Sequence, residues 1–293
     1  MIKKTVKYQN NLELSLHCDR QTEVKSDRGS RTVCRHRYTT YPLRLSTPFY
    51  LEGINSNRIY HYLINTSPGL LAGDRLNLSL QLAPNTSLYL TDQAATKVHP
   101  MPASDSKAVI NYQITVDRDS SLELVPEPII LYADAVLEQE LAIECHPTAK
   151  MFLSEIIIPG RIAKGEYYDF NYYFNRLQVT DLAGKLLVAD AVKLLGKNNQ
   201  FKNNRLFTSL PIIGNAIAIL PDTDLELLIG QIENLELANC KNVEMASSIL
   251  PSNNGISIRA LSSKTVELKK YFAYVINCIR LITNQPALPY IPK

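Results

Sequence analysis

The chain has 293 residues, of which 45% are hydrophobic and 20% are charged. This balance is typical of a folded globular protein. The net charge of +3 is too small to indicate nucleic-acid binding, and we find no pattern typical of a nucleic-acid module. No apolar stretch reaches the roughly 18 residues that a membrane-spanning helix needs. We therefore expect no nucleic acid and no membrane among the partners.

The first 44 residues are basic. They hold ten lysines and arginines against four acidic residues, a net charge of +6 that leaves −3 on the rest of the chain. We interpret this segment as a solvated surface arm, with steering toward an acidic partner as the alternative. No apolar run follows the first lysines, so we expect no secretory signal. The five cysteines are odd in number and far apart, which favours a reduced, cytoplasmic protein.

From about residue 60 to residue 195 the sequence predicts strands. Residues 76–82 alternate leucine with polar residues, as a half-buried strand does. Pro84 and Asn85 then indicate a turn, and we predict that residues 76–82 and 87–92 form a hairpin. Further strands with the same period are expected at residues 110–116, 137–143, 166–181 and 186–194.

The predicted strand at residues 166–181 carries an alternating aromatic stripe. We expect this stripe to face the core, with a protein interface as the alternative. After a hairpin turn at Gly184, residues 186–194 are expected to return beside this strand. The stripe consists of Tyr168, Phe170, Tyr172 and Phe174.

The last third of the chain changes from strand to helix periodicity. A helix is expected after residue 222, where Thr223 and Glu226 form a capping box. A second, amphipathic helix is expected at residues 264–285, stopped by a proline-rich tail. Between the two helices, "VEMASSIL" and "GISIRALSS" are expected to form a returning pair of strands. We predict one mainly β domain over residues 1–293, with a multi-stranded stacked-sheet or β-helix-like body and two C-terminal α-helices packed against it.

Motifs for the common chemistries are missing from the sequence. There is no phosphate-binding glycine loop and no nucleophile elbow. His17, Cys18, Cys34 and His36 supply metal-binding atoms, but a structural zinc site usually needs tighter pairs, and adjacent residues on a strand point to opposite faces. We therefore expect no tightly bound metal or cofactor.

Charged residues beside glycine and proline are the remaining candidates. Asp74 and Arg75 follow Gly73, and Glu155, Arg161 and Glu166 lie around a Pro-Gly turn. Such residues are often buried structural pairs that hold a strand corner. The alternatives are a polar path or docking surface, and a hydrolase site in which Glu155 and Glu166 are acid and base, roughly 5–10 Å apart.

Several ordered blocks of this sequence resemble one family. The most specific is "SPGLLAGDRLNLSLQLAPNTSLYLTDQAATKV", followed by "LVPEPIILYADAVLEQEL", "SEIIIPGRIAKGE" and "GISIRALSS". With these blocks the chain resembles the urease accessory protein UreD family, called UreH in some organisms, from about residue 36 to the last helix. Leu70 and Ala72 depart from glycines of the family pattern, and residues 1–35 align poorly.

The resemblance implies a non-catalytic urease maturation factor. Such proteins bind apo-urease and the accessory protein UreF, through which the GTPase UreG is recruited. They are thought to pass Ni²⁺ in transit through an internal polar path, with no tightly bound cofactor. A pure scaffold without a metal role is the alternative. The residues that we expect at the path or at a partner seam are Asp74, Arg75, Thr91, Gln93, Lys97, Glu155, Arg161 and Glu166.

Overall fold

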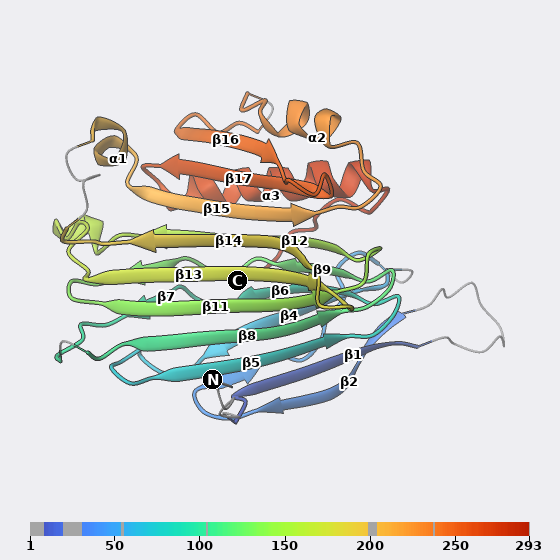
Figure 1. Cartoon of the computed structure of the whole chain (residues 1–293), viewed down its shortest axis with the longest axis horizontal. Helices are drawn as coiled ribbons and strands as arrows, with labels where there is room; N and C mark the ends of the chain where they lie inside the picture. The colour runs from blue at the N-terminus through green and yellow to red at the C-terminus, as the bar shows by residue number, and fades with distance from the viewer. Residues whose placement is uncertain are drawn as a thin grey trace.

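Two large β-sheets lie face to face, and helices cover the outer face of the second sheet (Figure 1). The predicted fold class, a mainly β stacked-sheet or β-helix-like body with two C-terminal helices packed against it, is confirmed. The structure is a computed structural model, and it describes residues 9–19, 31–53, 56–103, 105–198, 204–236 and 238–292.

In the described part of the chain the first sheet has seven strands. Its strands from β1 to β13 pair in parallel, and its two edge strands pair antiparallel. The spatial order is β14 (Leu186–Leu194), β13 (Tyr172–Asp181), β11 (Val136–Cys145), β8 (Ala108–Val116), β5 (Arg75–Leu82), β1 (Leu12–Asp19) and β2 (Arg31–Thr39).

The second sheet has ten strands within the same described ranges. Its centre is parallel, and the strands that follow β12 in the chain extend it with antiparallel pairs. The order is β16 (Val243–Ile249), β17 (Gly255–Ser262), β15 (Ile212–Ile219), β12 (Lys150–Ile158), β9 (Ser121–Leu124), β6 (Ser87–Asp92), β4 (Arg58–Asn65) and β3 (Leu43–Leu45). Off this order, β10 (Ile129–Leu131) pairs with β12, and β7 (Thr96–Val98) pairs with β10.

The chain alternates between the two sheets from β5 to β13, as in a β-helix. The predicted hairpin of β5 and β6 is therefore wrong, because β5 pairs with β1 and β8 while β6 pairs with β4 and β9. The predicted turn at Asn85, whose φ is 63°, carries the chain across to the other sheet. An alternating strand buries one face in either arrangement, so its period does not distinguish a hairpin from this crossing.

The main core lies between the two sheets. The alternating leucines of β5 and β6 form part of it: Leu80 and Leu88 have no exposed surface, and Leu78 and Leu90 are 1% exposed. Burying each such side chain contributes about 1.5–3 kcal/mol to folding. The alternation read from the sequence therefore identified the buried faces correctly, although it misplaced the partner strands.

The predicted aromatic stripe is divided in the structure. Tyr168 and Phe170 are fully buried, but they precede β13 in a turn, where Tyr168 has a φ of 55°. Within β13 the buried aromatic side chain is Tyr173, which was not in the stripe. Tyr172 and Phe174 stack with ring centroids 6.3 Å apart on the opposite, partly exposed face. The irregular turn shifts the alternation by one residue, so half of the stripe leaves the core.

Two helices of the C-terminal third pack on the second sheet, as predicted. α2 (Leu225–Ile232) contacts α3 (Thr265–Ile282), and both contact β16. Two short helices, η1 (Ile162–Lys164) and α1 (Arg205–Ser209), lie in connections. The buried residues of α3 are Leu268, Tyr271, Phe272, Val275, Ile276, Cys278, Ile279 and Arg280.

The predicted capping box at the start of α2 is wrong by one residue. Asp224 is the N-cap, and its carboxylate accepts a hydrogen bond from the backbone N–H of Leu227 at 3.0 Å. The hydroxyl of Thr223 donates instead to the carbonyl of Pro221. Asp and Thr are both good N-cap residues, so the sequence offered two adjacent candidates for one position.

Part of the basic N-terminal segment belongs to the first sheet, contrary to the surface arm that we expected. Leu12, Leu14 and Leu16 of β1 are at most 1% exposed and join the core. Residues 1–8 and 20–30 of the predicted arm lie outside the described residues. The charge of this segment is therefore carried in part by strands and not only by a solvated arm.

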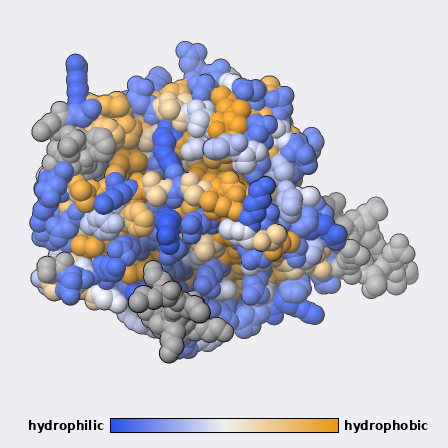
Figure 2. Space-filling model, viewed as in Figure 1, coloured by the Kyte–Doolittle hydropathy of each residue, from blue (hydrophilic) through white to orange (hydrophobic). Residues whose placement is uncertain are grey.

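The five cysteines are free thiols. Among the helices that the structure describes, none is both long and apolar enough to span a bilayer. Figure 2 shows apolar patches between hydrophilic side chains on the face that Figure 1 presents, where the strands of the first sheet lie in front. The features that bear on function lie mainly between the sheets.

Candidate functional site

A cavity whose lining is mainly apolar but includes charged and amide side chains lies between the two sheets. Its volume is about 80 Å³, which accommodates a few water molecules. The lining combines apolar side chains with four carboxylates, one guanidinium and three amides. These charged and amide residues are Asp92, Glu127, Glu155, Asp190, Arg259, Gln139, Asn175 and Asn215.

Two carboxylates of this cavity are buried, Glu155 of β12 with 7% of its surface exposed and Glu127 with 8%. Glu155 has the larger set of neutral donors, which come from three strands. Its Oε1 accepts hydrogen bonds from Asn175 Nδ2 at 2.7 Å, from Gln139 Nε2 at 3.2 Å and from the hydroxyl of Tyr173. Its Oε2 accepts one, from Asn215 Nδ2 at 3.3 Å. Burial raises the pKa of Glu155, and the bonds from Tyr173, Asn215 and Asn175 oppose that rise.

Two buried polar atoms of cavity-lining residues have no hydrogen-bond partner within the described part of the chain. One is the acceptor Asn175 Oδ1, and the other is the donor Arg259 Nη1. A buried polar group without a partner costs about 1–3 kcal/mol, so such atoms are normally paired with water or a ligand. The cavity is therefore suited to water or to a hydrated ion.

Arg259 of β17 extends from the cavity toward the surface. Its Nη2 donates to Oδ1 of Asp190 in β14 at 2.5 Å. The two side chains are 41% and 28% exposed, so this ion pair is partly in contact with solvent. Since β14 is an edge strand of the first sheet and β17 belongs to the second, the pair closes the space between the sheets at this edge.

The segment from Thr91 to Lys97 reaches the cavity through Asp92 and Thr96. These two residues also line a second cavity of about 40 Å³, together with Ala94 and Asn65. Both cavities share Ile110 and Tyr112 as well, so they are neighbours. The polar space between the sheets thus continues from Glu155 toward this segment.

The three residues predicted from this segment lie elsewhere. Gln93 and Lys97 are exposed, because neighbours along an extended chain point to opposite sides. Thr91 is buried and lines a groove of about 380 Å³ between α3, residues 288–291 and the second sheet. The segment therefore borders the cavity through residues between the predicted ones.

Asp74 and Arg75 stand apart from the cavity. Asp74 Oδ2 accepts a hydrogen bond from the backbone N–H of Leu71 at 2.8 Å, which closes the turn before β5. Arg75 is exposed and lines a groove with Lys107 and Glu138 on the outer face of the first sheet. Asp74 therefore has a structural role in a turn, and Arg75 belongs to the outer surface.

Arg161 and Glu166 form an ion pair at the corner around η1. Arg161 Nε donates to Glu166 Oε2 at 2.6 Å, and the backbone N–H of Ala133 donates to Glu166 Oε1 at 2.5 Å. The Arg161 guanidinium also lies 4.7 Å from the ring centroid of Tyr132. A Cβ at Gly160 would collide with the carbonyl of Glu166. This geometry matches the structural pair that holds a strand corner.

Glu155 and Glu166 accept hydrogen bonds from different residues, and Glu166 does not line the cavity that holds Glu155. A glycosidase-type pair needs both carboxyl groups on one cleft. The hydrolase alternative therefore has no support in the geometry of these two residues.

The zinc candidates of the first sheet have other contacts. Cys34 Sγ donates to the carbonyl of His36 at 3.5 Å, and the His36 ring lies 3.1 Å from the Glu13 carboxylate. Among the described residues, no three His, Cys, Asp or Glu side chains are grouped in a way that would hold a metal ion. The same holds for the carboxylates that line the cavity around Glu155, all of which lie in the described part of the chain.

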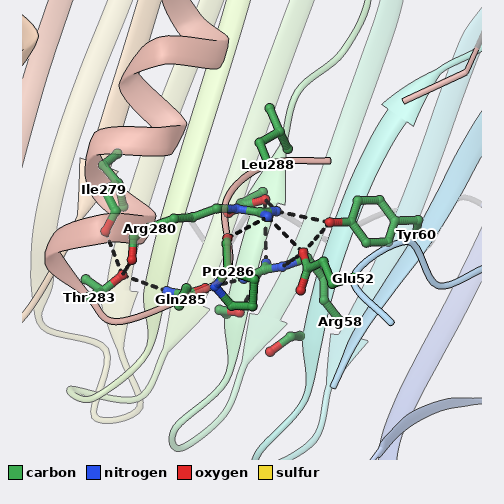
Figure 3. Close-up of polar contacts among 12 residues, drawn as sticks. Glu52, Arg58, Tyr60, Ile279, Arg280, Thr283, Gln285, Pro286 and Leu288 are labelled. Atoms are coloured by element: carbon green, nitrogen blue, oxygen red, sulfur yellow. Dashed lines mark hydrogen bonds and ion pairs between the residues drawn. The ribbon is translucent and has the colours of Figure 1, made fainter. Parts of the chain in front are cut away.

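A second polar cluster, which sequence reasoning missed, surrounds Arg280 (Figure 3). Arg280 has no exposed surface, and its guanidinium donates to both carboxylate oxygens of Glu123, at 2.9 and 2.6 Å, and to Glu52 at 2.8 Å. It also donates to the carbonyls of Pro286 and Ala287. The cluster therefore attaches the C-terminal segment to the second sheet. An arginine inside an apolar helix stripe was the only signal in the sequence.

The fold and the site together define a mainly β protein of two stacked sheets, with a buried carboxylate between them that four neutral donors hold. The comparisons with known proteins assign it to a family. The chain belongs to the UreD urease accessory protein family, because the model of that family matches residues 14–293. The resemblance read from the sequence is confirmed, and the chain is an accessory protein of urease maturation, a family whose members are generally non-catalytic.

Curated relatives match over most of their length. The chain is 50% identical over 284 residues to the urease accessory protein UreD of Trichodesmium erythraeum (strain IMS101), covering 97% of this chain and 99% of that protein. It is 24% identical over 268 residues to UreD of Cenarchaeum symbiosum (strain A), covering 90% and 92%. It is 26% identical over 244 residues to UreD of Photorhabdus laumondii, covering 83% and 75%.

Proposed function

We propose that this chain binds apo-urease in the cytoplasm, forms a complex with UreF and, through it, with the GTPase UreG, and passes Ni²⁺ toward the urease active site through the cavity at Glu155. The observation that supports the metal role is the buried Glu155 carboxylate, held ready by neutral donors in a polar cavity. The sequence has no NTPase motif, so GTP hydrolysis belongs to a separate chain.

The cavity has the chemistry of a transit site. In the part of the lining that the structure describes, four carboxylates face a single guanidinium, and neither cysteine nor histidine is present. Carboxylate, amide and water oxygens hold Ni²⁺ less firmly than thiolate and imidazole do. Conduction of an ion requires sites that are favourable to enter and still weak enough to leave. Glu155 Oε2, with a single long hydrogen bond, is the oxygen best placed to contact a cation.

The neighbouring spaces supply a direction for the path. The main cavity shares Asp92 and Thr96 with the second cavity, and it shares Pro126, Glu127 and Ser154 with the groove beneath α3. Lys269 of α3 pairs with Glu127 at that boundary. Small side-chain movements at these shared residues would join the three spaces, which is the arrangement that a passage through the β body requires.

The test is urease activation in cells. A urease operon lacking its own UreD gene, together with the matching UreF and UreG, is supplied with nickel and with this chain. We expect activity only when the chain is present, and we expect Glu155→Gln to lower it at least tenfold because the substitution removes the charge while keeping the shape. The control is Glu140→Gln, since Glu140 is 44% exposed and pairs with Arg176 on the outer face of the first sheet.

The nickel-path role and the pure-scaffold role predict different results in this assay. Full activation by a folded Glu155→Gln variant would contradict the cavity path and favour the pure scaffold. Absence of activation by the wild-type chain with its matching urease, UreF and UreG would contradict the maturation role itself.

A further inference from the structure

Among the described residues that line the cavity, Arg259 is the one arginine or lysine. Its two terminal nitrogens have different surroundings: Nη2 donates to Asp190, whereas Nη1 is buried without a hydrogen-bond partner in the described part of the chain. The guanidinium is also close enough to Glu155 to favour the charged form of that carboxylate. The positive charge of Arg259 therefore acts on two carboxylates, those of Asp190 and Glu155.

From this geometry we propose that Arg259 is a tethered counter-cation, which pairs with Asp190 at the cavity that holds Glu155 until a divalent cation displaces it. The inference rests on the proposed function and names the residue that sets how tightly the cavity holds its cargo. Glu155 and Asp190 attract a cation, and Arg259 competes with that cation for the same two carboxylates.

The surroundings allow Arg259 to leave. Its side chain is 41% exposed, and its partner Asp190 is 28% exposed on an edge strand, so the guanidinium can turn toward solvent without breaking a buried pair. The contrast within the molecule is Arg280, which has no exposed surface and holds two carboxylates and two carbonyls. Arg280 is fixed in place, whereas Arg259 can be exchanged for an incoming ion.

If Arg259 competes with the cation, removing each partner of the ion pair changes the affinity for the cation in a defined direction. A purely structural ion pair would not have this effect. Removing the arginine charge leaves two carboxylates without a counter-cation, so a divalent cation binds more tightly. Removing the Asp190 charge takes away one attraction and frees Arg259 for Glu155, so the cation binds more weakly. The two partners of one ion pair are therefore expected to shift nickel affinity in opposite directions.

The experiment is calorimetric titration of the purified full chain with Ni²⁺. We expect Arg259→Gln to bind about tenfold more tightly than the wild type and Asp190→Asn about tenfold more weakly, each a change of about 1.4 kcal/mol. Arg259→Lys, which keeps the charge, is expected to stay within about threefold of the wild type. Arg176→Gln is the matched control, because Arg176 is an exposed strand arginine whose partner is Glu140 on the outer face.

A double variant shows which carboxylate transmits the effect. In Glu155→Gln the additional change Arg259→Gln should no longer tighten binding, since the buried carboxylate that gains the cation is gone. In the activation assay Arg259→Gln should lower urease activity at limiting nickel, because the ion leaves the cavity more slowly.

Failure of the inference is distinguishable from failure of the proposed function. If Glu155→Gln weakens nickel binding but Arg259→Gln leaves it equal or weaker, the counter-cation role is overturned while the path survives. If Asp190→Asn tightens nickel binding, the counter-cation role of Arg259 is overturned as well. The Asp190→Asn variant also provides the test if Arg259→Gln does not fold. If neither the wild type nor any variant binds nickel, both proposals fall.

Discussion

At the scale of single residues, Glu155 shows how a site depends on partners that are distant in the sequence. Glycine and proline nearby made it a candidate. Its hydrogen-bond donors, however, come from β11, β13 and β15, and side-chain identities alone do not show that Gln139, Tyr173, Asn175 and Asn215 converge. Asp190 and Arg259 were missed for the same reason. Predicting this site from the sequence requires knowing which strands face one another.

The burial of Glu155 predicts how stability depends on pH. Burial raises its pKa above the ordinary 4.5, so the folded protein keeps this proton to a higher pH than the unfolded chain does. The free energy of unfolding therefore falls as the pH rises from below 4.5 through the raised pKa. We expect wild type to lose stability relative to Glu155→Gln over this interval, measured by urea unfolding at several pH values. A difference that is independent of pH would contradict the burial effect.

At the scale of elements, strand and helix positions could be predicted, while their partners could not. The alternating leucines of residues 76–82 and 87–92 are the buried faces of β5 and β6, and the apolar stripe of α3 is buried as expected. The same alternation allows strands to pair edge to edge or to pack face to face. Irregular turns, such as the one at Tyr168, shift the alternation and cannot be seen in the period itself.

The cap of α2 gives a test at this scale. Asp224 accepts the hydrogen bond from Leu227 N–H, while the Thr223 hydroxyl does not reach the helix. We expect Asp224→Ala to lower the free energy of unfolding by about 1 kcal/mol. Thr223→Ala should cost less than about 0.5 kcal/mol, measured in the same urea titration. The reverse order would restore the capping box that the sequence predicted.

At the scale of the whole molecule, the Arg280 cluster joins the C-terminal helix to segments that lie far earlier in the chain. Arg280 of α3 contacts Glu52, 228 positions earlier, and Glu123, 157 positions earlier. Arg58 lies against the same two carboxylates. The periodicity of α3 predicted an apolar face and gave no sign of a buried charge within it. That charge is tolerated because two carboxylates from distant segments compensate it.

Loss of this link should be costly. We expect Arg280→Met to lower the free energy of unfolding by about 3–5 kcal/mol, because among the described residues Arg58 would be the one positive charge left beside the two buried carboxylates of Glu52 and Glu123. Limited proteolysis should then cleave first after residue 282, where the C-terminal segment loses its anchor.

The control for this substitution is on the same helix. Lys270 is 53% exposed and pairs with Glu267 one turn away, so Lys270→Met should change stability by less than about 0.5 kcal/mol. Equal effects of the two substitutions would show that the buried cluster contributes no more than a surface ion pair.

The Arg280 cluster also imposes an order on biogenesis. A ribosome makes Glu52 and Glu123 long before it makes Arg280. A nascent chain that has already folded its first strands therefore holds two carboxylates before their main counter-charge has been translated. Burying them at that stage is unfavourable. The outer face of the second sheet is therefore finished only when the last helix emerges, and a product truncated before α3 lacks the arginine that neutralises it.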